Sequence, residues 1–274
     1  MDDLLDTHCH MQSAGLAEGE RSTRELWAKA PDITGAEIVA RAHAAGVSRM
    51  LCVGCDLEDS ELAISFVADQ PNCYATIGLH PHEAQHYFDQ PDRLAQFAAL
   101  ATSPKVVAVG ECGLDYFYEH SPREAQLATL RFQIELAQKH DLPMIFHVRE
   151  AFDDFWPVFS ERYAYKPIRG VLHSFTDSMQ NLQKATEYGL FIGVNGIATF
   201  AKQPAQLEVY KAIPLNKLLL ETDAPFLTPA PYRGKVNESK HLPIIANFLS
   251  ALRGEDIEVL ARATTANGRE LFLI

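Results

Sequence analysis

Near the start of the sequence stands Leu4-Leu5-Asp6-Thr7-His8-Cys9-His10, an apolar run that predicts a buried strand ending in two histidines. Side chains alternate between the two faces of a strand, so His8 and His10 point to one side and Cys9 to the other. Two imidazoles on one face of a strand end can form half of a metal site. Carboxylates or further imidazoles at other strand ends would complete it.

Seven further apolar runs follow, and each precedes a helix-like stretch. Nearly continuous runs of this kind are typical of parallel strands that are buried on both faces. With the first run, the predicted strands are residues 4–10, 49–55, 73–80, 106–113, 144–149, 170–174, 190–196 and 218–223. Eight β/α units without a linker predict a single domain over residues 1–274, a (β/α)8 TIM barrel. Two smaller α/β domains are the alternative.

Helix boundaries are marked by specific residues. Ser121, Pro122 and Glu124 have the order of an N-cap, a first-turn proline and a capping-box acid at the start of a long helix. Gly46 and Gly189 stand where glycines that end helices are expected.

Residues 11–34 make an unusually long connection, before a helix expected to begin near Gly35. In a barrel this connection lies on the catalytic face. We expect either a lid or wall over the substrate, or a tolerated surface insertion.

The composition is that of a globular protein with a full core, since 47% of the 274 residues are hydrophobic and 22% are charged. The net charge of −12 argues against a broad basic surface for nucleic acid. The first residues lack the basic region of a signal peptide, and no apolar stretch is long enough to span a bilayer. We expect a monomeric, cytoplasmic protein with no membrane partner.

The sequence contains five cysteines. Cys52 and Cys55 have the spacing of a redox pair. Positions i and i+3 of a strand face opposite sides, however, which favours buried reduced thiols.

Potential metal ligands recur at the carboxyl ends of the predicted strands, where the active sites of barrels are built. Any one of them could be an ordinary hydrogen-bonded residue. Six such side chains around one mouth would crowd two carboxylates and four imidazoles together, and metal ions resolve that crowding. The predicted ligands are His8, His10, Glu111, His147, His173 and Asp223.

Six ligands exceed what one four-coordinate site with an open position uses, so two divalent ions are predicted. A carboxylate can bridge two cations about 3.5 to 4 Å apart, and Glu111 is the best candidate for the bridge. We expect His8, His10, Glu111 and Asp223 on one ion, and Glu111, His147 and His173 on the other. Imidazole-rich ligation favours zinc, manganese or nickel, and the carboxylates leave magnesium open.

Basic and aromatic residues near these ligands suit an anionic substrate. Arg149 faces the same side of its strand as the ligand two residues before it, and Tyr232 and Arg233 follow the eighth strand. Arginine binds phosphate through two parallel hydrogen bonds. An ion pair of Arg149 with Glu150 or Asp115 is the alternative.

The third strand is followed by further histidines. His80 and His82 are candidates for proton transfer or phosphate contact. If the reaction is a hydrolysis, Asp223 or His80 would take the proton of the water that attacks the substrate, or return it. Residues 82–86 also match the His-Glu-x-x-His pattern of zinc proteases. That interpretation leaves the six strand-end ligands unexplained, so we disfavour it.

The same residues resemble the signature segments of the TatD family of metal-dependent hydrolases, within the amidohydrolase-like barrels. The resemblance spans the chain in order, and a further match lies at Thr264-Thr265-Ala266-Asn267. The matching segments are Asp6-Thr7-His8-Cys9-His10, Gly78-Leu79-His80-Pro81-His82, Gly110-Glu111-Cys112-Gly113-Leu114-Asp115-Tyr116, His147-Val148-Arg149, His173-Ser174-Phe175 and Glu221-Thr222-Asp223-Ala224-Pro225-Phe226-Leu227.

This resemblance implies metal-dependent phosphodiester cleavage, commonly described as 3′-to-5′ exonuclease action on DNA, and it implies the same six metal positions. The chain departs from the family pattern at two places. Val236 and Ser239 stand where the family usually has arginine and proline, and the 11–34 connection is longer than in most members. Neither departure touches a predicted ligand.

Two other functions stay open. Two metals could equally polarise the carbonyl of a carboxylic ester, as in removal of a misattached amino acid from tRNA, or act on another phosphoric ester. Phosphotriesterase-like barrels usually bridge their metals with a carboxylated lysine, and Glu111 at that place counts against them. A non-catalytic metal-binding scaffold is the alternative outside enzymes.

Overall fold

In the computed structural model, which describes residues 3–16 and 22–274, eight strands form one sheet in the order β1 to β8. The paired neighbours run parallel, as in β1 with β2 and in β7 with β8. Cys9 at the end of β1 also bridges to Ala224, just after β8. The predicted (β/α)8 barrel is confirmed. The strands are β1 (Leu4–Cys9), β2 (Val47–Val53), β3 (Cys73–Ile77), β4 (Val106–Asp115), β5 (Met144–Arg149), β6 (Gly170–Leu172), β7 (Phe191–Val194) and β8 (Leu218–Leu220).

Helices alternate with these strands along the chain. Within the described ranges, α1 lies in the long 11–34 connection, α2 to α9 follow the successive strands, and α10 comes last. The helices are α1 (Ser22–Trp27), α2 (Gly35–Ala44), α3 (Leu57–Ala68), α4 (Pro91–Ala99), α5 (Arg123–His140), α6 (Phe152–Tyr165), α7 (Met179–Glu187), α8 (Pro204–Ala212), α9 (Leu242–Arg253) and α10 (Ile257–Phe272). Short 3-10 helices add η1 (Met11–Ser13), η2 (Pro81–His86), η3 (Leu100–Thr102), η4 (Gly196–Phe200), η5 (Leu215–Lys217) and η6 (Ser239–His241).

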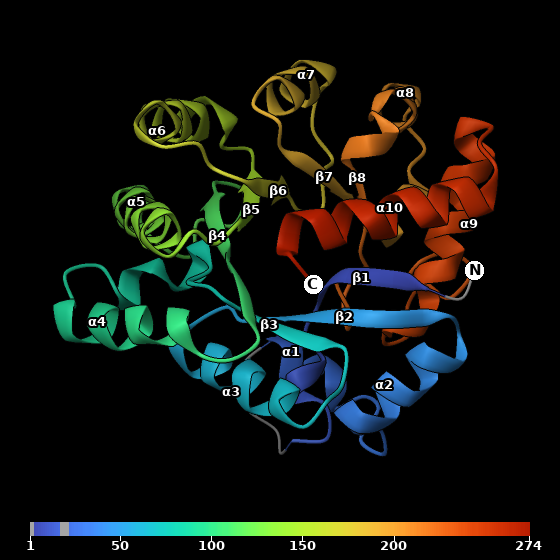
Figure 1. Cartoon of the computed structure of the whole chain (residues 1–274), viewed down its shortest axis with the longest axis horizontal. Helices are drawn as coiled ribbons and strands as arrows, with labels where there is room; N and C mark the ends of the chain where they lie inside the picture. The colour runs from blue at the N-terminus through green and yellow to red at the C-terminus, as the bar shows by residue number, and fades with distance from the viewer. Residues whose placement is uncertain (1–2, 17–21) are drawn as a thin grey trace. The chain divides into compact units, whose positions relative to one another are not determined.

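The residues group into two compact units. The first unit comprises Met1–Cys52, Gln70–Cys73 and Ser174–Glu270, and the second comprises Val53–Asp69, Tyr74–His173 and Leu271–Ile274. In the second unit, α5 and α6 pack on the outside of β4 and β5 (Figure 1). Their core includes the rings of Phe146, Phe155 and Phe159, with centroids 5.2 to 5.7 Å apart.

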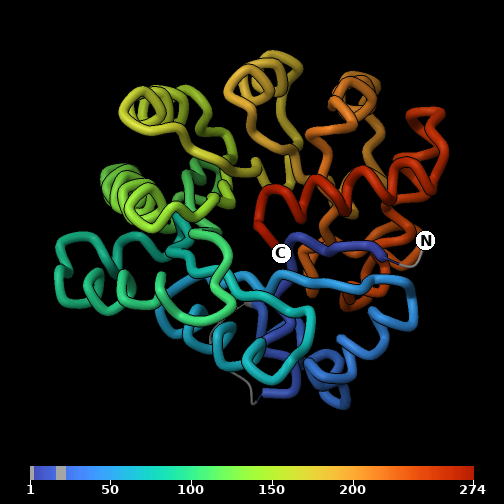
Figure 2. Tube along the Cα trace, in the orientation of Figure 1, coloured from blue at the N-terminus to red at the C-terminus, as the bar shows by residue number. Residues whose placement is uncertain are grey.

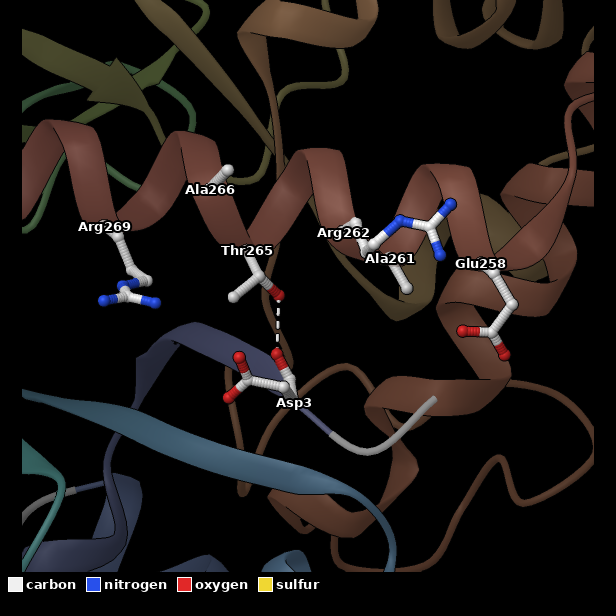
Figure 3. Close-up of a pocket in the computed structure, with 7 residues that line it drawn as sticks. All are labelled: Asp3, Glu258, Ala261, Arg262, Thr265, Ala266 and Arg269. Atoms are coloured by element: carbon white, nitrogen blue, oxygen red, sulfur yellow. Dashed lines mark hydrogen bonds between the residues drawn. The ribbon is translucent and has the colours of Figure 1, made fainter.

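In the first unit, α10 lies beside β1 although the two are far apart in sequence (Figure 2). Gly268 permits this approach, because a Cβ there would come within 2.5 Å of a Leu5 methyl group. The Thr265 hydroxyl donates to the carbonyl oxygen of Asp3 at 2.8 Å (Figure 3). A pocket of about 190 Å³ lies here, at the start of β1, whereas His8 and His10 lie toward the other end of the strand. This pocket is therefore distinct from the predicted site.

Several strands differ in length from the prediction, for local reasons. Ser174 and Asp223 were expected inside strands, but both have a left-handed backbone, with φ of 51° and 58°, so β6 and β8 end before them. The second strand begins and ends earlier than predicted, and its earlier end agrees with the hydrogen bond from the Cys55 amide to Asp59 in the first turn of α3 (3.1 Å). Strands β1, β3 and β7 also stop short of the predicted ends, and β4 continues to Asp115.

One predicted helix start is wrong. Pro122, not Ser121, is the N-cap of α5. The Ser121 hydroxyl instead donates to the His82 carbonyl at 2.6 Å and accepts from the Gln85 amide at 3.1 Å. The glycine signals are confirmed, since Gly46 and Gly189 follow α2 and α7 with positive φ.

The structure also shows where the cysteines lie and how long and apolar the helices are. Cys9, Cys52, Cys73 and Cys112 are buried and Cys55 is half-buried, while the reduced state of these thiols stays a prediction. Among the described residues, no helix has the length and apolar character needed to cross a membrane.

Candidate active site

Three predicted ligands come together in the first unit. His8 and His10 face the same side, with their Nε2 atoms 3.2 Å apart. The Asp223 carboxylate lies 3.6 Å from the first of these nitrogens and 3.3 Å from the second. Ligand atoms about 2.0 to 2.1 Å from one tetrahedral ion are separated by about 3.3 Å. The donor set and its spacing therefore fit a divalent metal.

Backbone hydrogen bonds between the end of β1 and the segment after β8 position this group. The Asp223 amide donates to the His8 carbonyl (2.8 Å), and the His10 amide donates to the Ala224 carbonyl (2.7 Å). Asp6 adds to the contact between β1 and the segment after β8, because its buried carboxylate accepts hydrogen bonds from the Thr222 amide and hydroxyl. These contacts place Asp223 opposite the two histidines.

The long connection after β1 also reaches this group. The Trp27 indole is buried and donates to the carbonyl oxygen of His10 at 2.9 Å. Residues 17–21 lie outside the described residues. This part of the connection therefore supports the end of β1, and its role as a lid or wall stays a prediction.

The second unit brings together the other predicted ligands. Glu111 on β4 is the centre: its Oε1 atom lies 2.8 Å from Nδ1 of His147 on β5 and 3.8 Å from Nε2 of His173 after β6. His80, predicted as a proton carrier, places Nε2 3.6 Å from the same oxygen. A carboxylate and two or three imidazoles around one point form a second set of metal-binding type.

A glycine makes room for the backbone of Glu111. A Cβ at Gly78 would lie 2.3 Å from the Glu111 amide nitrogen, so the end of β3 can approach β4 only without a side chain. The Glu111 amide also donates to the Gly54 carbonyl at 3.2 Å. The backbone of Glu111 is therefore fixed on both sides.

Asp115 is a member of the site to which the sequence analysis gave no such role. It is fully buried, and its Oδ2 atom lies 3.0 Å from Nε2 of His147 and 3.0 Å from Nε2 of His82. The signal was present in the sequence, because Asp115 lies four residues after Glu111, on the same face of a strand. A carboxylate behind a ligand histidine fixes the orientation and tautomer of its ring.

The pKa values of these groups follow from their partners. Burial alone would lower the pKa of His147, but hydrogen bonds to Asp115 and Glu111 outweigh it and raise the pKa to about 9. The Asp115 pKa lies well below its usual range, since the hydrogen bonds from His147 and His82 outweigh burial. Burial lowers the pKa of His80, which is therefore a neutral imidazole. Asp115 thus holds the Nε2 proton of His147, and Nδ1 faces Glu111.

The predicted substrate contacts are distributed over both units. Arg149 is exposed, and its guanidinium stacks on Phe117, whereas Asp115 serves the two histidines. Within the part of the chain that the structure describes, no carboxylate forms an ion pair with Arg149, so the ion-pair alternative is wrong. In the first unit, Tyr232 stacks on His241 with centroids 5.1 Å apart, and Arg233 lies 4.0 Å from the Phe200 ring centre.

The His-Glu-x-x-His segment does not have the geometry of a zinc protease. Residues 82–86 belong to the 3-10 helix η2. With three residues per turn, positions i and i+4 do not share a face. His82 is instead bonded to Asp115, as described above.

Comparisons with known proteins agree with this arrangement. A family model described as TatD-related DNase matches residues 5–273. YabD of Bacillus subtilis, named as an uncharacterized metal-dependent hydrolase, is 34% identical over 99% of this chain and 99% of its own. The 3′-5′ ssDNA/RNA exonuclease TatD of Citrobacter rodentium is 38% identical over 86% of this chain and 90% of its own. The crystal structure of YjjV, a TatD homologue from Escherichia coli, covers 99% of this chain and 98% of its own, with a TM-score of 0.84 at 28% identity. The chain belongs to the family of TatD-related DNases.

Proposed function

We propose that this protein is a metal-dependent nuclease that cleaves phosphodiester bonds of single-stranded nucleic acid from the 3′ end. The observation that carries the proposal is the pair of imidazole and carboxylate groups at the carboxyl ends of β1, β4 and β5. The names of several relatives, 3′-5′ ssDNA/RNA exonucleases at 36–38% identity, support the same reaction and the same direction.

Each ligand group is proposed to hold one divalent ion. His8, His10 and Asp223 would bind the first, and Glu111, His147 and His173 the second. Bound ions of this kind acidify water and neutralise phosphate charge, which is what phosphodiester hydrolysis needs. Zinc, manganese, nickel and magnesium all suit these donors. The sharing of the Glu111 carboxylate between two ions stays a prediction, which metal analysis of a Glu111 variant tests.

Side chains of this chain would carry the proton and hold the phosphate. Burial lowers the pKa of His80 and keeps it neutral, and its Nδ1 accepts the His82 amide, so Nε2 carries the proton and could donate it beside Glu111. Asp223 is a second candidate, since its carboxylate is only partly exposed and faces two imidazoles. The guanidinium groups of Arg149 and Arg233 would pair with phosphate oxygens.

The charge of the protein limits how it holds its substrate. With 36 acidic and 24 basic residues, it lacks the positive surface that binds long duplex DNA. We therefore expect contacts with short single strands and strand ends, and little internal nicking of closed circular duplex.

The first test is digestion of a 5′-labelled single-stranded oligonucleotide with added manganese, magnesium or zinc. We expect a ladder that shortens from the 3′ end, and no products after treatment with a chelator. A 3′-blocked oligonucleotide should resist. Equal activity in the chelator, or release of long internal fragments from circular duplex, would contradict the proposal.

A second test uses the departure at Val236. This residue is half-buried beside Asn237, whose side chain ties the loop after β8 to Thr222 and Phe226. An arginine here would add one charge-assisted phosphate contact at a partly exposed rim. Val236→Arg should lower the KM for an oligonucleotide about threefold. This effect is smaller than that of a water-excluded contact, which contributes roughly 1.5–3 kcal/mol. Hydrolysis of bis-p-nitrophenyl phosphate should not change. Equal effects on both substrates would show that position 236 does not hold nucleic acid.

A further inference from the structure

Two aromatic side chains stand exposed directly after β4, next to the ligand group of the second unit. Phe117 is 50% exposed and Tyr118 is 52% exposed. Among the described residues, they are the only exposed large apolar side chains that are adjacent in sequence. Rings of this size stabilise a fold strongly when they are buried, so two neighbouring rings left in solvent indicate a binding surface.

The backbone of this pair is held in place before any ligand arrives. The Oδ1 atom of Asp115 accepts hydrogen bonds from the amides of Phe117 and Tyr118, both at 3.0 Å. The Tyr118 ring is stacked on His120, with centroids 5.7 Å apart and planes 12° apart. Groups that are already ordered lose less conformational entropy on binding.

A positive charge lies against the same two rings. The guanidinium carbon of Arg149 is 4.0 Å from the ring centre of Phe117 and 4.9 Å from that of Tyr118. Arg149 is exposed, and stacking on aromatic rings leaves the edge of a guanidinium open to hydrogen bonding. Aromatic faces next to such an arginine match a nucleotide, which combines a planar base with a phosphate.

One carboxylate joins this surface to the ligand group. Oδ1 of Asp115 holds the two amides, while its Oδ2 lies 3.0 Å from Nε2 of His147. His147 in turn contacts Glu111 at 2.8 Å. A base placed on the rings would therefore belong to a nucleotide close to the bond that is cleaved.

We propose that Phe117, Tyr118 and Arg149 form an aromatic platform that binds an unpaired nucleobase and its phosphate beside the scissile bond, with the base stacked on one ring and edge-on to the other, because the planes of the two rings are 88° apart. This inference rests on the proposed nuclease function. Every base has a π-face, so the platform binds without regard to sequence. Bases in a duplex already stack on one another and are paired. The platform therefore selects single strands.

Kinetics of Phe117→Ala and Tyr118→Ala test the platform. Each variant should raise the KM for a single-stranded oligonucleotide about fivefold or more, the lower range for loss of one stacked base. The kcat/KM for bis-p-nitrophenyl phosphate should stay within about twofold, because that substrate needs only the metals and their ligands. Phe117→Tyr and Tyr118→Phe should behave like the unmodified protein.

Tyr165→Ala is the matched control. Tyr165 is 87% exposed at the end of α6, just before β6 begins. It therefore lies near the amino end of β6, whereas the metal ligands lie at the carboxyl ends of the strands. Its loss should leave the oligonucleotide KM unchanged. A similar rise in this variant would overturn the platform.

An abasic substrate separates stacking from other effects. An oligonucleotide without its terminal bases should bind the unmodified protein as weakly as the alanine variants bind the normal oligonucleotide. The alanine variants should lose little more on the abasic strand. If removal of the bases leaves the KM of the unmodified protein unchanged, the platform is wrong.

Binding measured without turnover separates this inference from the function on which it rests. Fluorescence anisotropy of labelled oligothymidylate in a chelator should show weaker binding by Phe117→Ala and Tyr118→Ala, even if the unmodified protein hydrolyses nothing with any metal. Unchanged affinity would overturn the platform, whatever the activity. A change in oligomeric state with unchanged affinity would identify the aromatic pair as a protein interface instead.

Discussion

The Glu111→Ala variant should lose at least about 100-fold in kcat/KM for phosphodiester hydrolysis and should no longer bind two metal ions per chain. The Glu111 carboxylate is buried, and its Oε1 atom faces His147, His80 and His173 at 2.8 to 3.8 Å. Its removal takes away the carboxylate that lies between the three imidazoles and would coordinate a cation with them. If the carboxylate is shared by two ions, both should be weakened at once.

Metal analysis of the purified variant gives the readout that activity alone cannot. Added metal should raise the melting temperature of the unmodified protein, because an ion that binds only the folded state stabilises it, and this rise should be smaller in the variant. Glu135→Ala is the matched control, since this exposed carboxylate on α5 of the same unit pairs with Arg162 at the surface. Two ions per chain in purified Glu111→Ala would contradict the assignment.

The positions of the predicted ligands could be read from the sequence because parallel strands have a simple rule. A buried parallel strand is a nearly continuous apolar run. Its carboxyl end faces the active site of a barrel, so polar residues at that end are candidates for function. His8, Glu111 and His147 obey this rule directly. Each lies in a strand, and each contacts the partners within its own unit that a ligand group requires.

Other features depend on turns whose conformation a pattern of apolar residues does not encode. Asp223 reaches His8 and His10 because its left-handed backbone turns the chain after β8 ends. Ser121 has the sequence of an N-cap, yet its hydroxyl bonds to the backbone of η2. In both cases a tertiary contact, and not local preference, determines the conformation.

Asp115 illustrates the same limit at the site itself. Its position on β4 follows from strand alternation, but its partner His82 comes from η2, and no periodicity predicts where that helix lies. The sequence left an ion pair of Asp115 with Arg149 open as an alternative. The fold decides between them by stacking Arg149 on Phe117.

Replacing Asp115 with asparagine should lower metal affinity about 10- to 100-fold and lower kcat by a similar factor. The Asp115 carboxylate accepts the Nε2 proton of His147, so it is Nδ1, which donates to Glu111 in the protonated ring, that would offer a lone pair to a metal once the second proton is lost. An asparagine amide would donate to Nε2 and favour the other tautomer, whose Nδ1 carries the proton and cannot bind a metal.

The oligonucleotide KM should change less than kcat, because the asparagine carbonyl can still accept the amides of Phe117 and Tyr118. Titration against a competing chelator measures the affinity, and kinetics on bis-p-nitrophenyl phosphate measure the rate. Asp56→Asn is the matched control, since Asp56 is a buried N-cap of α3 in the same unit and asparagine caps helices equally well. Unaltered metal affinity in Asp115→Asn would show that Asp115 does not set the tautomer of His147, and that its hydrogen bonds have only a structural role.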